Sequence, residues 1–380
     1  MIYLDNAATT YPKPEDVYNI MDEYNRFKAV NAGRGSYKAA RELSTLISET
    51  KNLLRKLVSV DINASVVLSP SITIALNQVL NGLEMNKNTT VYISPYEHNA
   101  VARTIHAIQK KIGINVKELP IDNATLEINL DKMRLEFSND KPSIVVCTHI
   151  SNVTGYILPI KNIFEEAKKY DAVTVLDTAQ SLGLIPVNAS YLHADIVAFA
   201  GHKSLYGPFG IGGFINVNNI PLNEYITGGT GSDSLNLEMP DGGESKYESA
   251  SSNIVAIAGL NAAIKSLNQE SIFKEEKVLT EYAISRLEKN NNIKMYLPEN
   301  KDNHIGIISF TYKGLSSDEV GMILDEDFDI AVRTGYHCAP FIHDYLNDKK
   351  SLGTVRIGLS QFTTKNDIDK LADALLELEM

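Results

Sequence analysis

Residues 173–203 read VTVLDTAQSLGLIPVNASYLHADIVAFAGHK and contain two short apolar runs, each followed by a side chain that can carry chemistry. The first run, VTVL, ends at Asp177, and the second, DIVAFA, is followed by Gly201, His202 and Lys203. Apolar runs of this length indicate buried strands. Open α/β sheets place ligand-binding groups at the carboxyl ends of their strands. This stretch therefore predicts two strands that bring a carboxylate and a lysine to one sheet edge.

The same alternation of short apolar runs and longer amphipathic segments extends toward the N-terminus. We expect strands at 66–68, 91–93, 116–119, 144–148 and 173–176, and helices at 35–60, 71–84, 99–111, 130–137 and 161–170. Strands that alternate with helices are typical of right-handed βαβ units in a largely parallel sheet covered on both faces. The predicted fold class is therefore α/β.

The C-terminal third has a different pattern. Residues 227–253 are polar and rich in Gly and Ser, which is typical of a loop. Two helix-like segments, a strand at 305–311 and a closing helix then predict a smaller α+β domain. The predicted division is a large α/β domain at 13–253 and a small domain made of 1–12 and 254–380.

The composition of the 380 residues is that of a globular protein, with 44% hydrophobic and 22% charged residues. A net charge of −11 argues against binding to nucleic acid or to an anionic membrane surface. Two distant cysteines, Cys147 and Cys338, support neither a disulfide framework nor a four-ligand zinc site. With no apolar leader or membrane span visible, we expect a cytoplasmic protein.

Taken singly, the polar residues of the stretch 173–203 have ordinary explanations. Asp177 could cap a helix, and Lys203 could be a solvated surface charge. Their combination with Gln180 on successive strand ends is more specific. Pyridoxal phosphate requires a lysine to hold its aldehyde and an acidic residue to keep its ring nitrogen protonated. The three residues therefore predict a pyridoxal phosphate site.

Seven blocks of the chain resemble, in order, those of the class V aminotransferase-fold cysteine desulfurases. They are DNAATT (5–10), EHNA (97–100), HISNVTG (149–155), DTAQ (177–180), GHKSLYGPFGIGG (201–213), RTGYHCAP (333–340) and TVRIG (354–358). The chain looks most similar to the SufS-like group, in a subgroup with a His-Cys-Ala-Pro cysteine segment. The resemblance implies the type I fold of pyridoxal-phosphate-dependent transferases and a homodimer with a shared active site.

The resemblance also implies how the cofactor is held. Lys203 carries it, and Asp177 pairs with the pyridine nitrogen. Gln180 contacts the ring hydroxyl, while His98 stacks on the ring face and moves protons. Asn152 reaches both a cofactor oxygen and the substrate carboxylate.

The phosphate contacts implied by the resemblance depart in part from the family pattern. Ser71 and Thr73 open a helix whose N–H groups suit a phosphate, although Ser71 stands where the family commonly has Gly. His202 matches a phosphate-contacting histidine, but Ala200 replaces a common serine. Ser251 stands in place of a threonine that reaches the phosphate of the neighbouring subunit.

The remaining residues of the resemblance concern the substrate. Arg356 is expected to clamp the substrate carboxylate, because a guanidinium forms two parallel hydrogen bonds with that group. Arg333, Ala8 and Arg34 are expected near the substrate. Cys338 is expected to be the nucleophile, with Arg333 and a neighbouring histidine, His337, favouring its thiolate.

The predicted reaction is the conversion of L-cysteine to L-alanine, with a persulfide left on Cys338 for transfer to an acceptor. Lys203 and His98 complete the expected catalytic set. A selenocysteine lyase or a cysteine β-lyase of the same fold stays open, as does a weakly active scaffold that binds a sulfur acceptor. A transaminase needs no nucleophilic cysteine.

Other candidate residues receive structural interpretations. Cys147 lies within an apolar run and is expected in the core. His337, Cys338 and His343 could supply three metal ligands, but nothing else in the sequence supports a metal site. His106, His193 and His304 match no block and are expected to be surface or capping residues.

Overall fold

The computed structural model describes residues 1–32, 37–230 and 235–378. At its centre lies a seven-stranded sheet in the order β2-β8-β7-β6-β5-β3-β4. Its strands are β2 (Ser65–Ser69), β3 (Thr90–Ile93), β4 (Asn115–Glu118), β5 (Ile144–Thr148), β6 (Val173–Asp177), β7 (Ile196–Ala200) and β8 (Gly212–Asn216). From β7 to β4 neighbouring strands run parallel, whereas β8 is antiparallel to both of its neighbours. The predicted α/β class is confirmed.

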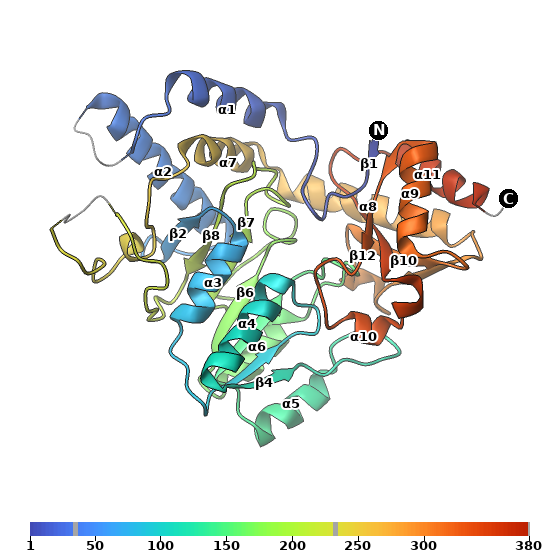
Figure 1. Cartoon of the computed structure of the whole chain (residues 1–380), viewed down its shortest axis with the longest axis horizontal. Coiled ribbons are helices and arrows are strands. Elements are labelled where there is room, and N and C mark those ends of the chain that lie inside the picture. Colours follow the sequence, from blue (N-terminus) through green and yellow to red (C-terminus); the bar gives the residue numbers. More distant parts are fainter. Residues whose placement is uncertain (33–36, 231–234, 379–380) are drawn as a thin grey trace.

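Helices cover both faces of this sheet (Figure 1). One face packs against α3 (Ile72–Gly82) and α4 (Asn99–Ile112), and the other against α2 (Lys38–Leu57), α5 (Leu130–Asn139), α6 (Ile160–Lys168) and α7 (Ile254–Ser266). Consecutive strand residues point to opposite faces. Val175 therefore packs with the first group and Leu176 with the second. No helix in the described parts of the chain has both the length and the apolarity to span a membrane.

A second, antiparallel sheet lies beside the first, in the order β12-β13-β10-β9. It consists of β9 (Ile293–Tyr296), β10 (Ile307–Tyr312), β12 (Arg333–Gly335) and β13 (Thr354–Gly358), and it packs with α8 (Gln269–Leu287), α9 (Ser317–Phe328) and α11 (Lys365–Glu377). The N-terminal strand β1 (Ile2–Tyr3) pairs with β11 (Ile330–Ala331). The short elements are α10 (His343–Leu346), η1 (Glu244–Lys246), η2 (Lys301–Asn303) and η3 (Lys349–Ser351).

The helix α7 bears on where the two predicted domains divide. Its buried residues Ile257 and Leu260 belong to the core of the seven-stranded sheet, and the helix also packs on α1 (Glu15–Phe27). The predicted division places α7 in the small domain. We propose instead that the large domain extends through α7 and that the boundary lies between α7 and α8.

The polar segment predicted as a loop is attached to the edge strand β2 by buried charges. Lys51 on α2 lies 2.6 Å from Glu244 and 2.8 Å from Glu248, and its side chain is only 7% exposed. The same two carboxylates accept the backbone N–H groups of Val66 and Leu68, each at 2.8 Å. The segment thus supplies hydrogen-bond acceptors for backbone N–H groups of the edge strand β2, which would otherwise have no partner.

Replacement of Lys51 tests this attachment. In Lys51→Met the largely buried Glu248 loses its counter-ion and Glu244 keeps only Arg55, so we expect the free energy of unfolding to fall by about 2–4 kcal/mol. Urea denaturation measures the change. As a control, Lys265→Met removes an exposed pair with Glu49 and should cost less than about 1 kcal/mol. Equal effects of the two substitutions would show that the buried network is not stabilising.

Candidate active site

A cavity of about 230 Å³ opens where the carboxyl ends of the parallel strands meet the second sheet. Its walls bring together residues from eight separated segments of the sequence. Among the predicted site residues it is lined by Ala8, Ser71, Thr73, His98, Asn152, Asp177, Gln180, His202, Lys203, Arg333, Cys338 and Arg356. The strand ends therefore gather the predicted residues into one site, as the α/β topology requires.

Lys203 and Asp177 occupy the floor of this cavity. Lys203 lies in the turn between β7 and β8, and within the described residues its amine makes no hydrogen bond or ion pair. Burial lowers the pKa of Lys203, while Asp177 partly opposes the shift. The carboxylate of Asp177 accepts the Ala179 N–H at 2.8 Å, and burial raises its pKa. A desolvated amine of this kind is a stronger nucleophile and proton acceptor at neutral pH.

His98 forms one wall and caps α4. Its Nδ1 accepts the N–H of Ala100 at 3.0 Å, so in the neutral ring the proton lies on Nε2. Burial, reinforced by the positive charge of Lys203, lowers the pKa of His98 to about 4. The cavity therefore contains a neutral imidazole that is fixed in orientation and can donate from Nε2.

A buried carboxyl group, Glu97, lies directly behind His98 and was not singled out by the sequence. It is fully enclosed, and its Oε1 accepts hydrogen bonds from Ser94 Oγ and from the Thr148 N–H, both at 2.6 Å. Glu97 thus links the ends of β3 and β5. Burial raises its pKa to about 8, so at neutral pH the group is protonated. In the sequence, Glu97 stands out only as an acidic residue next to His98. Its burial could not be predicted, because it depends on tertiary packing.

The start of α3 and the ring of His202 form a polar end of the cavity. Ser71 caps α3 by accepting the Ile74 N–H at 3.3 Å, and Thr73 lies in the first helical turn. The Nδ1 atom of His202 is buried without a hydrogen-bond partner, and the ring stacks on Phe209. Free N–H groups at a helix start and an unpaired ring nitrogen are suited to an anion.

Arg356 on β13 is almost completely buried and joins three segments. Its Nη2 donates to Asp5 at 2.7 Å, and its Nη1 donates to the backbone oxygen of Asn152 at 2.9 Å. The Nε atom has no partner. A guanidinium has five N–H donors, so three are left for a carboxylate. Asp5 is a further site residue that the sequence reasoning missed, because only the fold brings it to Arg356.

The cysteine segment has an unusual backbone that is held by two hydrogen bonds. His337 and Cys338 have φ angles of 47° and 57°, the left-handed region that costs about 1–2 kcal/mol for a residue with a side chain. Asn152 Nδ2 donates to the carbonyl of His337 at 2.8 Å, and the Asn99 N–H donates to that of Cys338 at 2.6 Å. These bonds keep the exposed thiol of Cys338 at the mouth of the cavity.

The structure corrects the expected role of His337. Its ring is buried and its Nε2 lies 2.8 Å from Thr354 Oγ1, while burial lowers its pKa well below the usual value. His337 is therefore neutral and is not a cationic neighbour of Cys338. The guanidinium of Arg333 lies at the cavity wall, 4.0 Å from Asp5. Cys147 lies fully buried in β5, as predicted.

The histidines of this region do not converge on a metal. The ring of His343 contacts Asp348 and the Tyr336 carbonyl. The ring of His337 has a different partner, Thr354. Among the described residues, no group of three or more His, Cys, Asp or Glu side chains could hold a metal ion. The surface position expected for His304 is wrong, because that ring is buried and bonds to the Ile307 carbonyl.

Of the predicted site residues that the structure describes, one lies outside the cavity. Ser251 lines a separate hollow of about 240 Å³ beside the start of α7. Its predicted contact with a neighbouring subunit stays a prediction. Arg34 falls outside the residues that the structure describes.

Comparison with known proteins agrees with this arrangement. Residues 2–371 match the aminotransferase class-V pattern. The chain belongs to the class-V aminotransferase family. It is 32% identical to a probable cysteine desulfurase of Pyrococcus abyssi, over 100% of this chain and 94% of that protein, and 29% identical to a cysteine desulfurase of Haloferax volcanii, over 99% and 88%.

The solved structures extend the similarity to three dimensions. The structure resembles that of the apo cysteine desulfurase of Thermococcus onnurineus, with a TM-score of 0.90 and 26% sequence identity. The match covers 99% of this chain and 94% of the Thermococcus chain. The family resemblance drawn from the seven blocks is thus confirmed. The SufS-like subgroup stays a prediction.

The raised pKa of Glu97 gives a pH prediction. The unfolded chain releases this proton near pH 4.5 and the folded chain near 8, so within that window the folded state binds more protons and stability falls as pH rises. Glu97→Gln removes the titration. From about pH 5 to about pH 8, the wild type should lose on the order of 3 kcal/mol relative to the variant. Urea denaturation at both pH values measures the loss, and parallel pH profiles would contradict the assignment.

Proposed function

We propose that this class-V aminotransferase is a pyridoxal-phosphate-dependent cysteine desulfurase that converts L-cysteine to L-alanine and leaves a persulfide on Cys338. The single observation that carries the proposal is the cavity in which Cys338 faces Lys203 and Arg356. An amine, a carboxylate-binding group and a thiol are the protein groups that this reaction needs. The names of the relatives in Pyrococcus abyssi and Haloferax volcanii support the same activity.

The residues of the cavity fit pyridoxal phosphate. The amine of Lys203 is without a partner and would hold the aldehyde, with buried Asp177 at the ring nitrogen and His98 on the ring face. The free Nδ1 of His202 and the start of α3, with Thr73, would meet the phosphate. When bound, the cofactor supplies an electron-withdrawing ring that makes the α-proton of an amino acid acidic.

Three further residues would complete the cofactor site. Gln180 donates from Nε2 to the Ala7 carbonyl at 2.7 Å, which fixes its amide beside the ring hydroxyl position. Ser71 adds a hydroxyl at the phosphate end. In a homodimer with a shared site, Ser251 would serve the phosphate of the other subunit. Ala200 is buried in the sheet core and supplies no hydroxyl.

The protein groups divide the reaction between them. The free donors of Arg356 bind the substrate carboxylate, with Asn152 beside it, and the amine of Lys203 removes the α-proton. The Cys338 sulfur then attacks the substrate sulfur, so that an S–S bond forms as the substrate C–S bond breaks. The proton released by the Cys338 thiol completes the alanine methyl group, with His98 passing it on, and Lys203 returns the α-proton. Arg333 and Ala8 line the substrate side of the cavity, and Arg34 keeps its predicted role there.

The partners and the location belong to the same proposal. The substrate is L-cysteine or L-selenocysteine, and a thiol acceptor must remove the sulfur from Cys338 because the persulfide otherwise blocks the next turnover. We propose that the protein works in the cytoplasm, where both of its free cysteines stay reduced.

Two substitutions test the proposal. With L-cysteine and dithiothreitol, the wild type should form alanine and sulfide in equal amounts. Cys338→Ala should retain the visible absorbance of the cofactor and lose at least about 100-fold of both products, because the nucleophile is gone. Lys203→Ala should lose both the absorbance and the activity. Cys147→Ala serves as the control, since it removes the other thiol without touching the cavity.

Other results would identify a different protein. Sulfide with pyruvate, unaffected by Cys338→Ala, would indicate a cysteine β-lyase. Turnover of selenocysteine alone would indicate a selenocysteine lyase. A bound cofactor without turnover of either substrate would indicate a scaffold and would contradict the proposal.

A further inference from the structure

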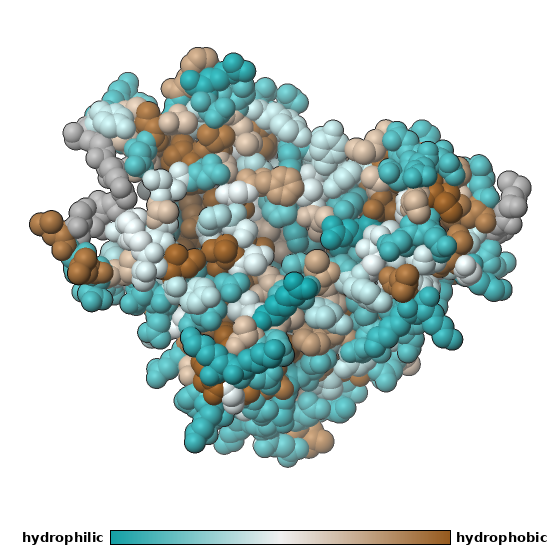
Figure 2. Space-filling view, viewed as in Figure 1, coloured by the Kyte–Doolittle hydropathy of each residue, from teal (hydrophilic) through white to brown (hydrophobic). Residues whose placement is uncertain are grey.

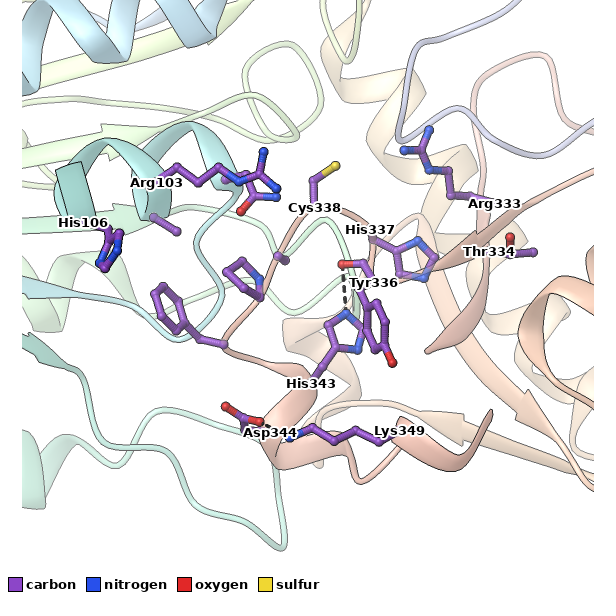
Figure 3. Close-up of a pocket in the computed structure, with 15 residues that line it drawn as sticks. Arg103, His106, Arg333, Thr334, Tyr336, His337, Cys338, His343, Asp344 and Lys349 are labelled. Carbon is purple, nitrogen blue, oxygen red and sulfur yellow. Dashed lines mark hydrogen bonds and ion pairs between the residues drawn. The ribbon is translucent and has the colours of Figure 1, made fainter. Parts of the chain in front are cut away.

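A second and larger cavity, of about 820 Å³, adjoins the catalytic cavity at the cysteine segment (Figure 3). Figure 3 shows Arg103 and His106 on α4 at one wall, Arg333 and Thr334 at the opposite wall, and Cys338 between them. Cys338 lines both this cavity and the catalytic one. Arg333 and His337 also line both, so the cysteine segment lies where the two cavities adjoin.

The walls of this outer cavity carry more positive than negative charge. Arg103 is exposed and makes no ion pair within the described residues. The carboxylate nearest to Arg333 belongs to Asp5 and lies 4.0 Å away. The carboxylate of Asp344, in contrast, is already paired with Lys349 at 2.6 Å. Of the two arginines, Arg103 has no counter-ion among the described residues, and Arg333 has only the distant Asp5.

This local charge contrasts with the rest of the chain, whose net charge is −11. A positively lined hollow in an acidic protein concentrates anions at one place. The cavity volume falls in the range of about 300–1,000 Å³ that is typical of small-molecule sites. On the face of the molecule drawn in Figure 2, the apolar side chains form several separate groups among hydrophilic ones. These features favour a small anionic ligand over an apolar protein surface.

We propose that the outer cavity binds a low-molecular-weight anionic thiol, one that carries carboxylates, and that this thiol removes the sulfur from Cys338. The inference rests on the proposed function, which supplies the persulfide. Substrate and acceptor then reach the same sulfur from two adjoining cavities.

The transfer step is balanced without an external oxidant or reductant. The acceptor thiolate attacks the outer sulfur of the Cys338 persulfide, and a new S–S bond forms on the acceptor. The S–S bond to Cys338 breaks, and the leaving thiolate takes up the proton that the acceptor thiol released. Arg103 and Arg333 hold the acceptor carboxylates and so position its sulfur.

Two probes with the same thiol scaffold test the proposal. The holoenzyme is first loaded with L-cysteine, freed of excess substrate and assayed for persulfide on Cys338. It is then discharged either with glutathione or with glutathione diethyl ester, which lacks the carboxylate charges. The measured quantity is the second-order rate constant for discharge by glutathione divided by that for discharge by the diethyl ester. A general change in enzyme reactivity affects both constants and cancels in this ratio.

We expect Arg103→Gln to lower this ratio by about five- to tenfold, since one charge-assisted contact is lost. Lys110→Gln is the matched control, because Lys110 is an exposed cation on the same helix that does not line the cavity. It should leave the ratio unchanged. An unchanged ratio in Arg103→Gln would overturn the inference and leave the cavity to a macromolecular acceptor. Failure of the wild type to form any Cys338 persulfide would instead overturn the proposed function as well.

Discussion

The buried guanidinium of Arg356 is the interaction on which the rest of the site depends. A buried charge is tolerated only where it is paired and hydrogen-bonded, and Arg356 meets this requirement by donating to Asp5 and to the carbonyl of Asn152. It thereby fixes the N-terminal loop, the segment after β5 and the second sheet against one another. Asn152 in turn holds the carbonyl of His337 and with it the strained turn that presents Cys338. Arg356, proposed to bind the substrate, and Cys338, the proposed nucleophile, are therefore positioned by one hydrogen-bonded chain.

The two sides of the cysteine segment differ in their solvent exposure. In the catalytic cavity, burial lowers the pKa of Lys203 and of His98, which favours the neutral forms that the proposed proton transfers need. Cys338 is exposed, and the outer cavity beside it carries the unpaired charge of Arg103. A dry compartment suits proton abstraction from a bound amino acid. An open, positively charged compartment suits exchange of sulfur with a soluble thiol.

Much of the fold and of the site could be predicted from the sequence, for reasons that can be stated residue by residue. Apolar runs separated by amphipathic segments determine the parallel sheet, and sheet topology then brings Asp177 and Lys203 to one edge. The helix α1 was not predicted, although its apolar residues recur at helical spacing, and only Val17 within it is buried. The sequence could not show that the ring of His337 turns toward Thr354, or that Asp5 reaches Arg356 across 351 positions. Those contacts depend on how the two sheets meet.

The central claim is that Cys338 receives the sulfur of L-cysteine. Peptide mass spectrometry of the holoenzyme after a single turnover with ³⁴S-labelled L-cysteine tests it most directly. The account predicts that the peptide containing Cys338 gains one labelled sulfur atom, that the peptide containing Cys147 gains none, and that one alanine is released for each atom bound. Labelled sulfide in solution with an unmodified Cys338 peptide, in the absence of any added thiol, would contradict it.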